Sequence, residues 1–579
     1  MNRLVPAKFS IKGSYFAFIL TLSLVLVWKS PNAQVLNAGQ PFYEELIRRL
    51  DVAGELDNDL SFLIRPLDLR KVNYTYLDSL LDGKTIYPRL NSKNGFLLVP
   101  FQVSYRYNPS NLTAYGDRMM VPTAGHQTYL SAGFFAKLGI LNVQFQPEFV
   151  LAQNAPFEGY SDDFNPSVAL TRFIYWNNGD YPERFGDGKY QKLWWGQSKI
   201  SLTGKYVELY AGTQNIHWGP GQFNSLIFGK NAPGFTHLSL NTVKPVKTFI
   251  GSFEAQVLMG RLENSFFEPS QQPELNERFY IPVESDWRYL NAFTFTYNPK
   301  WTPGLYFGIN RTFQVNNNLM GNSLDDYFPV FQFFQKEKVI DDGNTLVYDN
   351  LGTDQQVSIF TRIVAREAKA EIYFEFGRRD HSYNWREFIL NPEHARAYLL
   401  GFQKLIPVRS SLHYIQVRGE MVQQQESVNR YIRYVGLGGN LTWHTHGTAR
   451  GFSNEGQALG VGIGTGSNSQ VIEVAYVSPI SKMGALFSRI ENNEDFFYRA
   501  FGLTEENNPW VDFGLSLLMD RRWDDFTLAS KLTLVSSQNR QWKSYLIPSE
   551  EFKKSETSFN AMFEVDLLFH PWHSKGRGR

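Results

Sequence analysis

Residues 558–570 read SFNAMFEVDLLFH. Every odd-numbered position in this stretch is apolar, whereas the even-numbered positions include Asn560, Glu564 and Asp566. Side chains alternate between the two faces of a β-strand, so the pattern predicts a strand with one apolar and one polar face. Charged groups on the second face indicate that it meets water or a polar interior.

This period of two recurs along most of the chain. In AEIYFEF (370–376) apolar positions alternate with Glu371 and Glu375, and HYIQVRGEM (413–421) alternates in the same way. Further stretches of this kind lie near 96–107, 128–151, 192–213, 246–260, 289–298, 304–313, 356–367, 396–406, 471–489, 511–520 and 526–537. Stretches of about ten residues have the length of tilted membrane-crossing strands. The sequence therefore predicts an all-β fold, a large transmembrane antiparallel β-barrel.

A soluble β-sandwich or propeller would also produce alternating strands. A propeller is disfavoured because the sequence has no repeat of fixed period. The apolar faces are rich in Phe and Leu over many strands, more than one soluble core can absorb, whereas a lipid-facing band absorbs them all. The barrel is thus the favoured interpretation, with outer-membrane lipid as its first partner.

Composition supports a barrel and excludes several function classes. Aromatic residues make up 16% of the 579-residue chain, as expected of aromatic girdles at two membrane surfaces. The 57 basic and 56 acidic residues nearly cancel, which gives no electrostatic footprint for nucleic acid. The chain has no cysteine, which excludes disulfides, thiolate metal sites and a cysteine nucleophile.

The N-terminus has the pattern of a secretory signal. Lys8 and Lys12 precede an apolar run from Ser14 to Trp28, and the small residue Ala33 stands before the expected cleavage point. The run is shorter than the roughly 20 apolar residues of a spanning helix, which disfavours the alternative of an uncleaved anchor. We therefore expect a signal peptide over 1–33 and export through the inner membrane.

Four regions are expected. After the signal peptide, residues 34–90 form an N-terminal helical bundle in the lumen or on the periplasmic side, because 41–82 spaces apolar residues at helical intervals and predicts two or three short helices. Residues 91–572 form the barrel, and 573–579 a basic tail. Short connections such as 203–205 alternate with long ones, as periplasmic turns and outer loops do in such barrels.

One loop is unusually rigid and almost without charge. Residues 213–235 read TQNIHWGPGQFNSLIFGKNAPGF and follow a predicted strand. Alternation places Val207 and Leu209 on the lipid face and Trp195 in the lumen. Indole faces stack on sugar rings while amides and charges bind hydroxyls, so the sequence predicts a polysaccharide-binding surface. The candidate binding residues are Trp195, Lys199, Gln214, His217, Trp218, Arg418 and Glu420, and the candidate structural residues are Gly196, Gly219, Pro220, Gly221, Asn231 and Pro233. The alternative is that each Trp packs structurally or belongs to a girdle.

The chain resembles the outer-membrane capsule assembly proteins of the Wzi type from about residue 43 to its C-terminus. The motifs that carry the resemblance are YEELIRRLDVAGEL with IRPLDLR, QPEFVLAQN, Trp195–Gly196, HWGPG, NAPGF and KPVKTFIGSFEAQVLMGRLE. The resemblance implies an eighteen-stranded barrel with a helical bundle occluding its periplasmic side, and a lectin-like role in holding capsular or extracellular polysaccharide at the cell surface. It also implies contact with the polysaccharide export machinery. Two features depart from the family, long loops such as 314–355 and the basic ending HSKGRGR.

Catalytic and metal chemistry are not indicated. His444 and His446 in WHTHG lack a third ligand at a recognisable spacing, and the Gly-rich 459–469 matches neither phosphate-binding pattern. No nucleophile–base pair stands out, so we expect no catalytic residue, metal or cofactor. A porin or substrate channel remains the alternative function, and a structural or adhesion barrel a third, but a diffusion pore has no use for forty residues that block it.

Overall fold

The computed structural model describes residues 35–56, 60–68, 94–110, 116–283, 287–331, 337–341, 344–348, 352–379, 389, 395–408, 412–426, 442–502, 508–546 and 557–570. The expected signal peptide, the basic tail and residues 69–90 of the expected bundle lie outside this part. No helix in the described residues is both long enough and apolar enough to cross a membrane.

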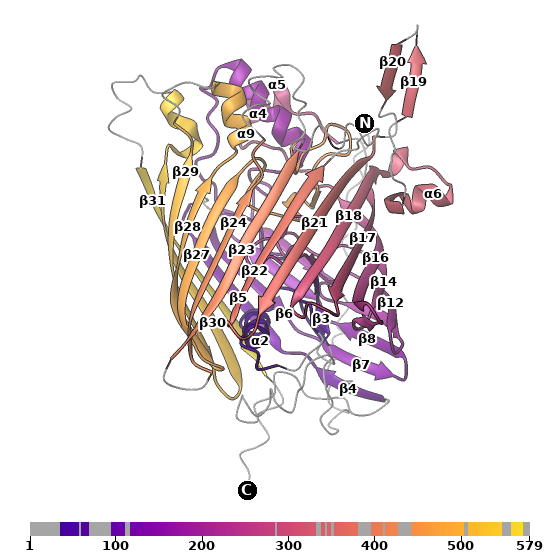
Figure 1. Cartoon of the computed structure of the whole chain (residues 1–579). Coiled ribbons are helices and arrows are strands. Elements are labelled where there is room, and N and C mark those ends of the chain that lie inside the picture. The colour runs from indigo at the N-terminus through magenta and orange to yellow at the C-terminus, as the bar shows by residue number, and fades with distance from the viewer. Residues whose placement is uncertain are drawn as a thin grey trace, which may run out of the picture.

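The main body of the protein is one antiparallel sheet of 23 strand segments that closes on itself (Figure 1). Its segments are β4 (Asn94–Leu98), β5 (Phe101–Asn108), β6 (Gly125–Ser131), β7 (Phe134–Leu138), β8 (Leu141–Phe145), β9 (Glu148–Ala152), β10 (Tyr190–Trp194), β11 (Lys199–Thr203), β12 (Val207–Gly212), β14 (His237–Thr242), β15 (Val246–Lys247), β16 (Gly251–Glu263), β17 (Trp287–Pro299), β18 (Leu305–Asn316), β21 (Asp354–Ala365), β22 (Ala370–Arg379), β23 (Arg396–Pro407), β24 (Tyr414–Gln423), β27 (Asn468–Val477), β28 (Ser481–Glu491), β29 (Val511–Arg522), β30 (Phe526–Gln538) and β31 (Thr557–Phe569). The last segment, β31, pairs with β5 near the start of the chain and closes the barrel.

Smaller elements lie inside the barrel, on its wall or at its ends. The short strands are β1 (Val35–Leu36), β2 (Ile64–Arg65), β3 (Leu67–Asp68), β13 (His217–Trp218), β19 (Glu337–Asp341), β20 (Asn344–Tyr348), β25 (Ser453–Asn454) and β26 (Gln457–Ala458). The helices are α2 (Tyr43–Val52), α4 (Pro166–Gly179), α5 (Pro273–Phe279), α6 (Leu324–Tyr327), α9 (Glu494–Phe501), η2 (Asn317–Leu319), η3 (Pro329–Phe331) and η4 (Arg540–Tyr545).

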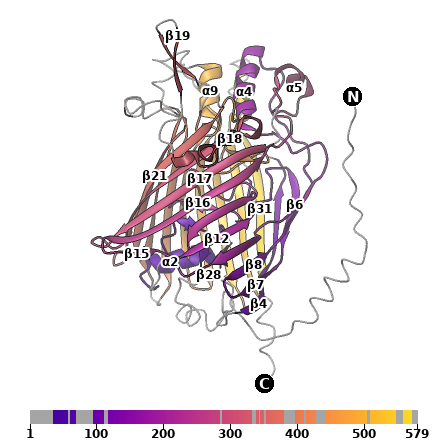
Figure 2. The same cartoon turned by 90° about the vertical axis from the view of Figure 1, so that its right-hand side faces the viewer.

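The two ends of the barrel differ. Short turns such as 139–140, 204–206 and 478–480 join strands at one end, here called the turn end. The long connections meet at the other end, the loop end, where α4, α5 and α9 form a cap (Figures 1 and 2). The predicted alternation of short and long connections is therefore confirmed.

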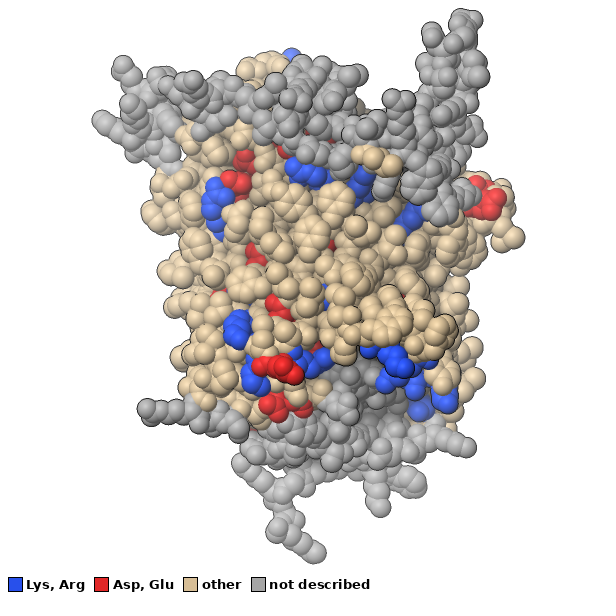
Figure 3. Space-filling model, in the orientation of Figure 1, with Lys and Arg blue, Asp and Glu red and all other residues tan. Residues whose placement is uncertain are grey.

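The outer surface of the wall is apolar, as predicted. Ile200, Leu209 and Phe374 have exposed fractions of 59%, 43% and 39%, whereas their neighbours Lys199 and Glu375 are buried inside at 6% and 0%. Figure 3 shows a mostly uncharged band around the middle of the visible face, with charged side chains gathered towards its upper and lower margins. Apolar residues on this scale do not face water on a monomeric soluble protein, and they match the lipid-facing band of a membrane barrel.

One segment folds against the outside of the wall. Residues 317–331, called the wall flap, contain η2, α6 and η3 and lie on β17 and β18. Arg311 shares the outward face of β18 with exposed Phe307, and its Nη1 donates to the Val330 carbonyl at 2.7 Å. The ring of Phe331 stacks on Phe293 at 5.8 Å. The flap therefore covers a guanidinium that would otherwise face lipid at high cost.

Helix α2 lies inside the barrel near the turn end (Figures 1 and 2). Its apolar side forms a core with the wall, in which Tyr43, Leu46 and Leu50 pack with Leu97 and Leu568. Residues 41–82 were predicted to hold two or three helices, but in the described part only α2 is an α-helix. Residues 64–65 and 67–68 are instead extended, since β2 pairs with β13 and β3 pairs with β1.

We expect Leu517→Arg to impair folding into lipid. Leu517 is 52% exposed in the middle of β29, where an arginine on the lipid face costs roughly 2–4 kcal/mol. The control is Ile140→Arg, which replaces a 64%-exposed side chain in a turn, where the cost is about 0–1 kcal/mol. Urea titration of folding into phospholipid vesicles measures both. Equal stabilities of the two variants would contradict the membrane placement of β29.

Candidate functional site

Helix α2 is fixed to the wall by buried ion pairs on one side. Glu45 lies 3.0 Å from Arg418 on β24 and 2.7 Å from Lys482 on β28, and both cations also contact Glu473 on β27. Burial alone would raise the pKa of Glu45, but Arg418 and Lys482 hold it well below its ordinary value. The carboxylate is therefore ionised and holds α2 across three strands.

A second set of ion pairs holds the end of α2. Asp51 accepts from Arg362 at 3.1 Å and from Arg366 at 2.8 Å, and the Asp51 and Arg362 side chains are both fully buried. Arg362 also contacts Glu371, which in turn accepts from Arg48 of α2 at 2.8 Å. Together these contacts make α2 a plug whose charged groups are matched by charges on the barrel wall.

The rigid loop 213–235 folds into the bore and joins the plug. Its β13 pairs with β2, and Arg65 donates to the carbonyls of Gly219 and Gly221 at 2.9 and 3.0 Å. Gly219 has φ +92°, and a Cβ there would stand 2.8 Å from the Glu375 carboxylate. The turn at Gly219–Pro220–Gly221 is therefore packed between Arg65 and the Glu375 carboxylate.

Glu420 supports this loop directly. Its carboxylate accepts from the backbone N–H groups of Gln222, Phe223 and Asn224 at 2.7 to 3.2 Å. Tyr373 donates to the same carboxylate at 2.9 Å. With these bonds made, Glu420 holds the loop in place, rather than offering a free carboxylate to a ligand as the sequence suggested.

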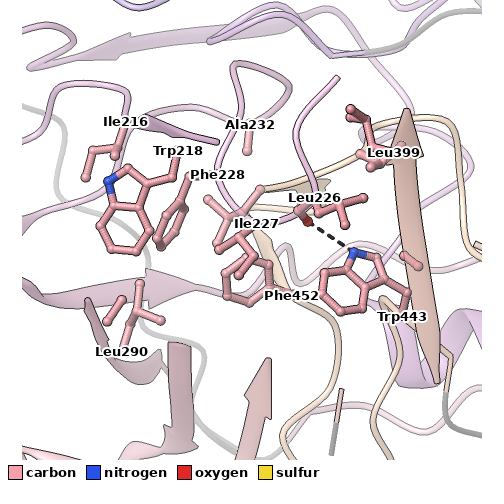
Figure 4. Packing of buried hydrophobic residues seen from close by; sticks show 14 of the residues in the cluster. Ile216, Trp218, Leu226, Ile227, Phe228, Ala232, Leu290, Leu399, Trp443 and Phe452 are labelled. Carbon is pink, nitrogen blue, oxygen red and sulfur yellow. Dashed lines mark hydrogen bonds between the residues drawn. The ribbon is translucent and has the colours of Figure 1, made fainter. Parts of the chain in front are cut away.

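Trp218 has a structural role. It is fully buried, its ring lies edge-on to Phe228 at 4.8 Å, and its Nε1 donates to Gln256 at 2.9 Å. Figure 4 shows it in a cluster that extends to Trp443, whose Nε1 donates to the Leu226 carbonyl at 3.1 Å. The expectation that Trp218 stacks on a sugar in a wet cavity is wrong, because loop 213–235 has its own apolar core.

Trp195 points outward, and its predicted lumenal position is wrong. Its side chain is 60% exposed and packs edge-on to Phe145 at 6.2 Å, whereas Lys199 faces the bore. Residues 195–198 interrupt the strand between β10 and β11, and Gly196 in this gap has φ +59°. The irregularity shifts the alternation by one residue, as a β-bulge does. Trp195 therefore belongs to the outer aromatic surface.

The remaining predicted residues are buried or bonded to other parts of the protein. Lys199 is paired with Glu208 at 3.2 Å, and Gln214 is 2% exposed. Asn231 donates to the Gly460 carbonyl, which ties loop 213–235 to the Gly-rich loop. The carbonyl of Pro233 accepts from Asn454 at 3.2 Å, which makes a second tie.

Three adjoining cavities lie around these inner loops. The inner cavity, about 190 Å³, lies against α2 and is lined by His217 and Arg418 among others. The middle cavity, about 300 Å³, shares Phe223 and Lys230 with it. The outer cavity, about 210 Å³, adjoins the middle one at Asn231 and opens among the long loops of the loop end.

The outer cavity combines aromatic faces with unpaired donors. It is lined by Trp176, Tyr181, Trp510, Trp542 and the buried Arg172. Donor atoms on three of these side chains have no hydrogen-bond partner within the described chain, namely Arg172 Nε and Nη1, Tyr181 Oη and Trp542 Nε1. Trp176 is partly exposed and carries the Arg172 guanidinium over its ring at 4.5 Å. Such a site suits a ligand with apolar ring faces and many hydroxyl acceptors.

A sequence profile of the family described as "Capsule assembly protein Wzi" matches residues 102–524, which span the wall from β5 to β29 and the loops that fill the bore. The chain belongs to the Wzi family. The resemblance predicted from the sequence is thus confirmed.

The Wzi fold extends over nearly the whole chain. The structure is similar to Wzi of Escherichia coli, described as an outer membrane protein involved in group 1 capsule assembly and a carbohydrate-binding β-barrel, with a TM-score of 0.57 and 13% identity over 93% of this chain and 100% of that one. At this identity the likeness shows a shared fold. The structure of Acinetobacter baumannii OccAB4 has a TM-score of only 0.35 at 9% identity, over 83% of this chain and 98% of its own. This score is too low to show a shared fold. A search of curated proteins found no match.

The sequence did not identify the outer cavity of this Wzi-family chain. Its residues come from six separate connections, and only the folded barrel brings Trp176, Trp510 and Trp542 together. The aromatic richness of 173–176 (FIYW) and 496–498 (FFY) in otherwise polar loops was the available signal. In the described part of the chain, no group of three or more His, Cys, Asp or Glu residues is placed to hold a metal.

We expect Asp51→Ala to loosen the plug. The change leaves the fully buried Arg362 without one of its partners, and breaking a buried pair costs about 3–5 kcal/mol. Rates of trypsin cleavage within the N-terminal segment of the folded protein, measured across a urea series, report the change. The control is Glu55→Ala, whose ion pair with Lys369 is at 3.9 Å and partly exposed, so its loss costs less than about 1 kcal/mol. Unchanged cleavage in Asp51→Ala would contradict the clamping role of these ion pairs.

Proposed function

We propose that this Wzi-family protein is a non-enzymatic, lectin-like barrel of the outer membrane that binds capsular or extracellular polysaccharide and helps to assemble or anchor it at the cell surface. The observation that carries the proposal is the outer cavity, where partly exposed Trp176 and the unpaired donors of Arg172 and Tyr181 face one space. The E. coli relative of the same fold is described as carbohydrate-binding, which supports the proposal.

The architecture proposed for this role is an eighteen-stranded barrel with a periplasmic plug. In five places two segments follow each other within a few residues and count as one interrupted strand, namely β4/β5, β6/β7, β8/β9, β10/β11 and β14/β15. Counted in this way, the 23 segments make eighteen strands that cross the wall. We assign residues 1–33 to a signal peptide, 34–90 to the bundle that contains α2, 91–572 to the barrel and 573–579 to a basic tail. The turn end then faces the periplasm and the loop end the cell exterior.

The filling of the bore argues against a diffusion channel. Helix α2, loop 213–235 and residues 442–467 all lie inside the wall, and Trp218 and Trp443 in these loops are fully buried. These segments obstruct the bore, whereas a diffusion channel needs an open aqueous passage. The long loops around the outer cavity are placed to meet polysaccharide, and the polysaccharide export machinery is the second proposed partner.

Deletion of the gene tests the function in cells. We expect polysaccharide to be made but shed into the medium, and wild-type complementation to restore the cell-bound fraction. Complementation with Trp176→Ala should restore less, because loss of one aromatic contact weakens binding by about 0.5–1.5 kcal/mol. Trp195→Ala is the matched control, since Trp195 faces outward and should restore attachment fully. An unchanged capsule in the deletion strain would overturn the proposal.

Planar-bilayer recordings test the channel alternative. We expect the intact protein to show no large open conductance, because the inner loops and α2 occupy the bore. A variant lacking residues 35–68 should conduct only if the inner loops also move, so its conductance should stay far below that of an open barrel of this size. A large steady conductance in the intact protein would favour the porin function instead.

A further inference from the structure

A row of lysines lies along one part of the turn end. It spans three connections that contain no Asp or Glu, 204–206, 243–250 and 300–304. Their lysines are Lys205, Lys244, Lys247 and Lys300. The N–H of Val243 donates to the Tyr206 carbonyl at 2.8 Å, and the N–H of Lys300 donates to the Ile250 carbonyl at 3.1 Å. Because these bonds join the three connections, they form one continuous basic surface, here called the lysine rim.

Three of these lysines have no ion pair within the described chain, namely Lys205, Lys244 and Lys300. The ammonium groups of Lys205 and Lys244 lie 5.1 and 5.3 Å from the centre of the same Tyr206 ring. The side chains of Lys205 and Lys300 are exposed. Two positive charges beside one ring, with no counter-charge of their own, favour an anion at this place.

Large apolar side chains stand among the lysines. Phe249 and Trp301 are 85% and 71% exposed, and the Tyr206 ring is exposed as well. Tryptophan and tyrosine side chains favour the boundary between a bilayer and water. Lysine side chains at that boundary place their stems along apolar surface and their ammonium groups among the headgroups. The lysine rim thus has the composition of a surface at the level of lipid headgroups.

The lysine rim is also continuous with the lipid-facing wall. Val207 and Leu240 are exposed on the strands that adjoin it, and Phe253 stacks on Tyr297 at 4.8 Å. Figure 2 shows β15 and the adjoining ends of β16 and β17 projecting sideways beyond the rest of the turn end. A surface that leans outward from a membrane barrel lies along the lipid. This geometry favours a lipid over a periplasmic protein as the occupant.

The lack of carboxylates indicates which class of lipid fits. A zwitterionic headgroup brings a cation beside its phosphate, and the lysine rim offers that cation no Asp or Glu. The carboxylates next along the strands, Glu208 and Glu254, are buried in the bore, and Glu208 is paired with Lys199 at 3.2 Å. A headgroup with a net negative charge leaves no cation unmatched, and lysines near a membrane surface attract such headgroups.

We propose that the lysine rim binds anionic phospholipid headgroups of the periplasmic leaflet. A lipid phosphate accepts from the Lys205 and Lys244 ammonium groups beside Tyr206, while Phe249 and Trp301 contact the adjoining lipid. This site lies at the opposite end of the barrel from the outer cavity, so the inference goes beyond the proposed function. It takes from that proposal only the orientation, which places the turn end at the periplasmic leaflet.

Native mass spectrometry of the full-length protein in detergent tests the inference. The probes are phosphatidylglycerol and phosphatidylcholine with the same acyl chains, supplied at equal concentrations. We expect the first bound lipid to be phosphatidylglycerol by a factor of at least about fivefold, the effect of one lysine near an anionic headgroup. The preference should fall as salt is added, because exposed charges are screened.

Two sets of variants and a control locate the effect. Glutamine at both Lys205 and Lys244 should abolish the preference, whereas arginine at both should keep it. Trp301→Ala should weaken both lipids equally, because the indole carries no charge. Neither lysine side chain has a hydrogen bond within the described chain, so folding should be retained. Lys189→Gln, which changes an exposed lysine at the loop end, is the matched control and should change nothing.

The outcomes separate this inference from the proposed function. Equal binding of the two lipids, or a preference that survives the double glutamine variant, overturns the inference and leaves the lysine rim to a protein partner. Displacement of phosphatidylglycerol by an equal concentration of inorganic phosphate overturns it too, because the rim would then be a general anion site. So does a preference for lipopolysaccharide that the double variant abolishes, since the turn end would then face the outer leaflet. Capsule retention in the deletion strain bears on the proposed function alone.

Discussion

The structure depends on pairing charges inside a closed wall. Helix α2 brings Glu45, Arg48 and Asp51 into the bore, and strands β21, β22, β24 and β28 supply the opposite charges. Buried ion pairs add little net stability compared with apolar packing, but an unmatched member is expensive. This asymmetry fixes where α2 sits and how it is turned. Arg65 of β2 links loop 213–235 to α2, because it donates to the Gly219 and Gly221 carbonyls and to Glu44. The inner cavity lies between these segments.

The two faces of the wall follow opposite rules. Leucine, isoleucine and phenylalanine point outward on almost every strand, while glutamate, arginine and glutamine point inward, where their partners are. Arg311 is an exception on the outer face, and the wall flap covers it with the Val330 carbonyl. The exception shows how strictly the rule applies, since a separate segment is folded back to satisfy one guanidinium.

The sequence was most informative where structure is local. Alternation along single strands placed Glu371, Glu375 and Arg418 in the bore and Leu209 on the outside, and all four positions are confirmed. It failed at Trp195, because one irregular step at Gly196 puts Trp195 out of phase with Lys199 and Ile200 and leaves no mark in a pattern of apolar residues. It failed at Trp218 because the partners of that ring, Phe228 and Gln256, are set by how a loop folds back on itself. The lining of the outer cavity comes from six connections far apart in sequence, so no single local pattern could reveal it.

The closing seam constrains the order in which the molecule is made. Strand β31 pairs with β30 along Phe526–Gln538 but with β5 only from Phe563 to Phe569, so the joint between the chain's two ends is shorter than the joint on the other side of β31. Such a joint, between segments far apart in sequence, is slow to form because a large loop-closure entropy opposes it. Helix α2 precedes every wall strand yet ends up enclosed by them. Because the charges that hold α2 belong to β21, β22, β24 and β28, the plug has its full set of partners only once this part of the wall has assembled.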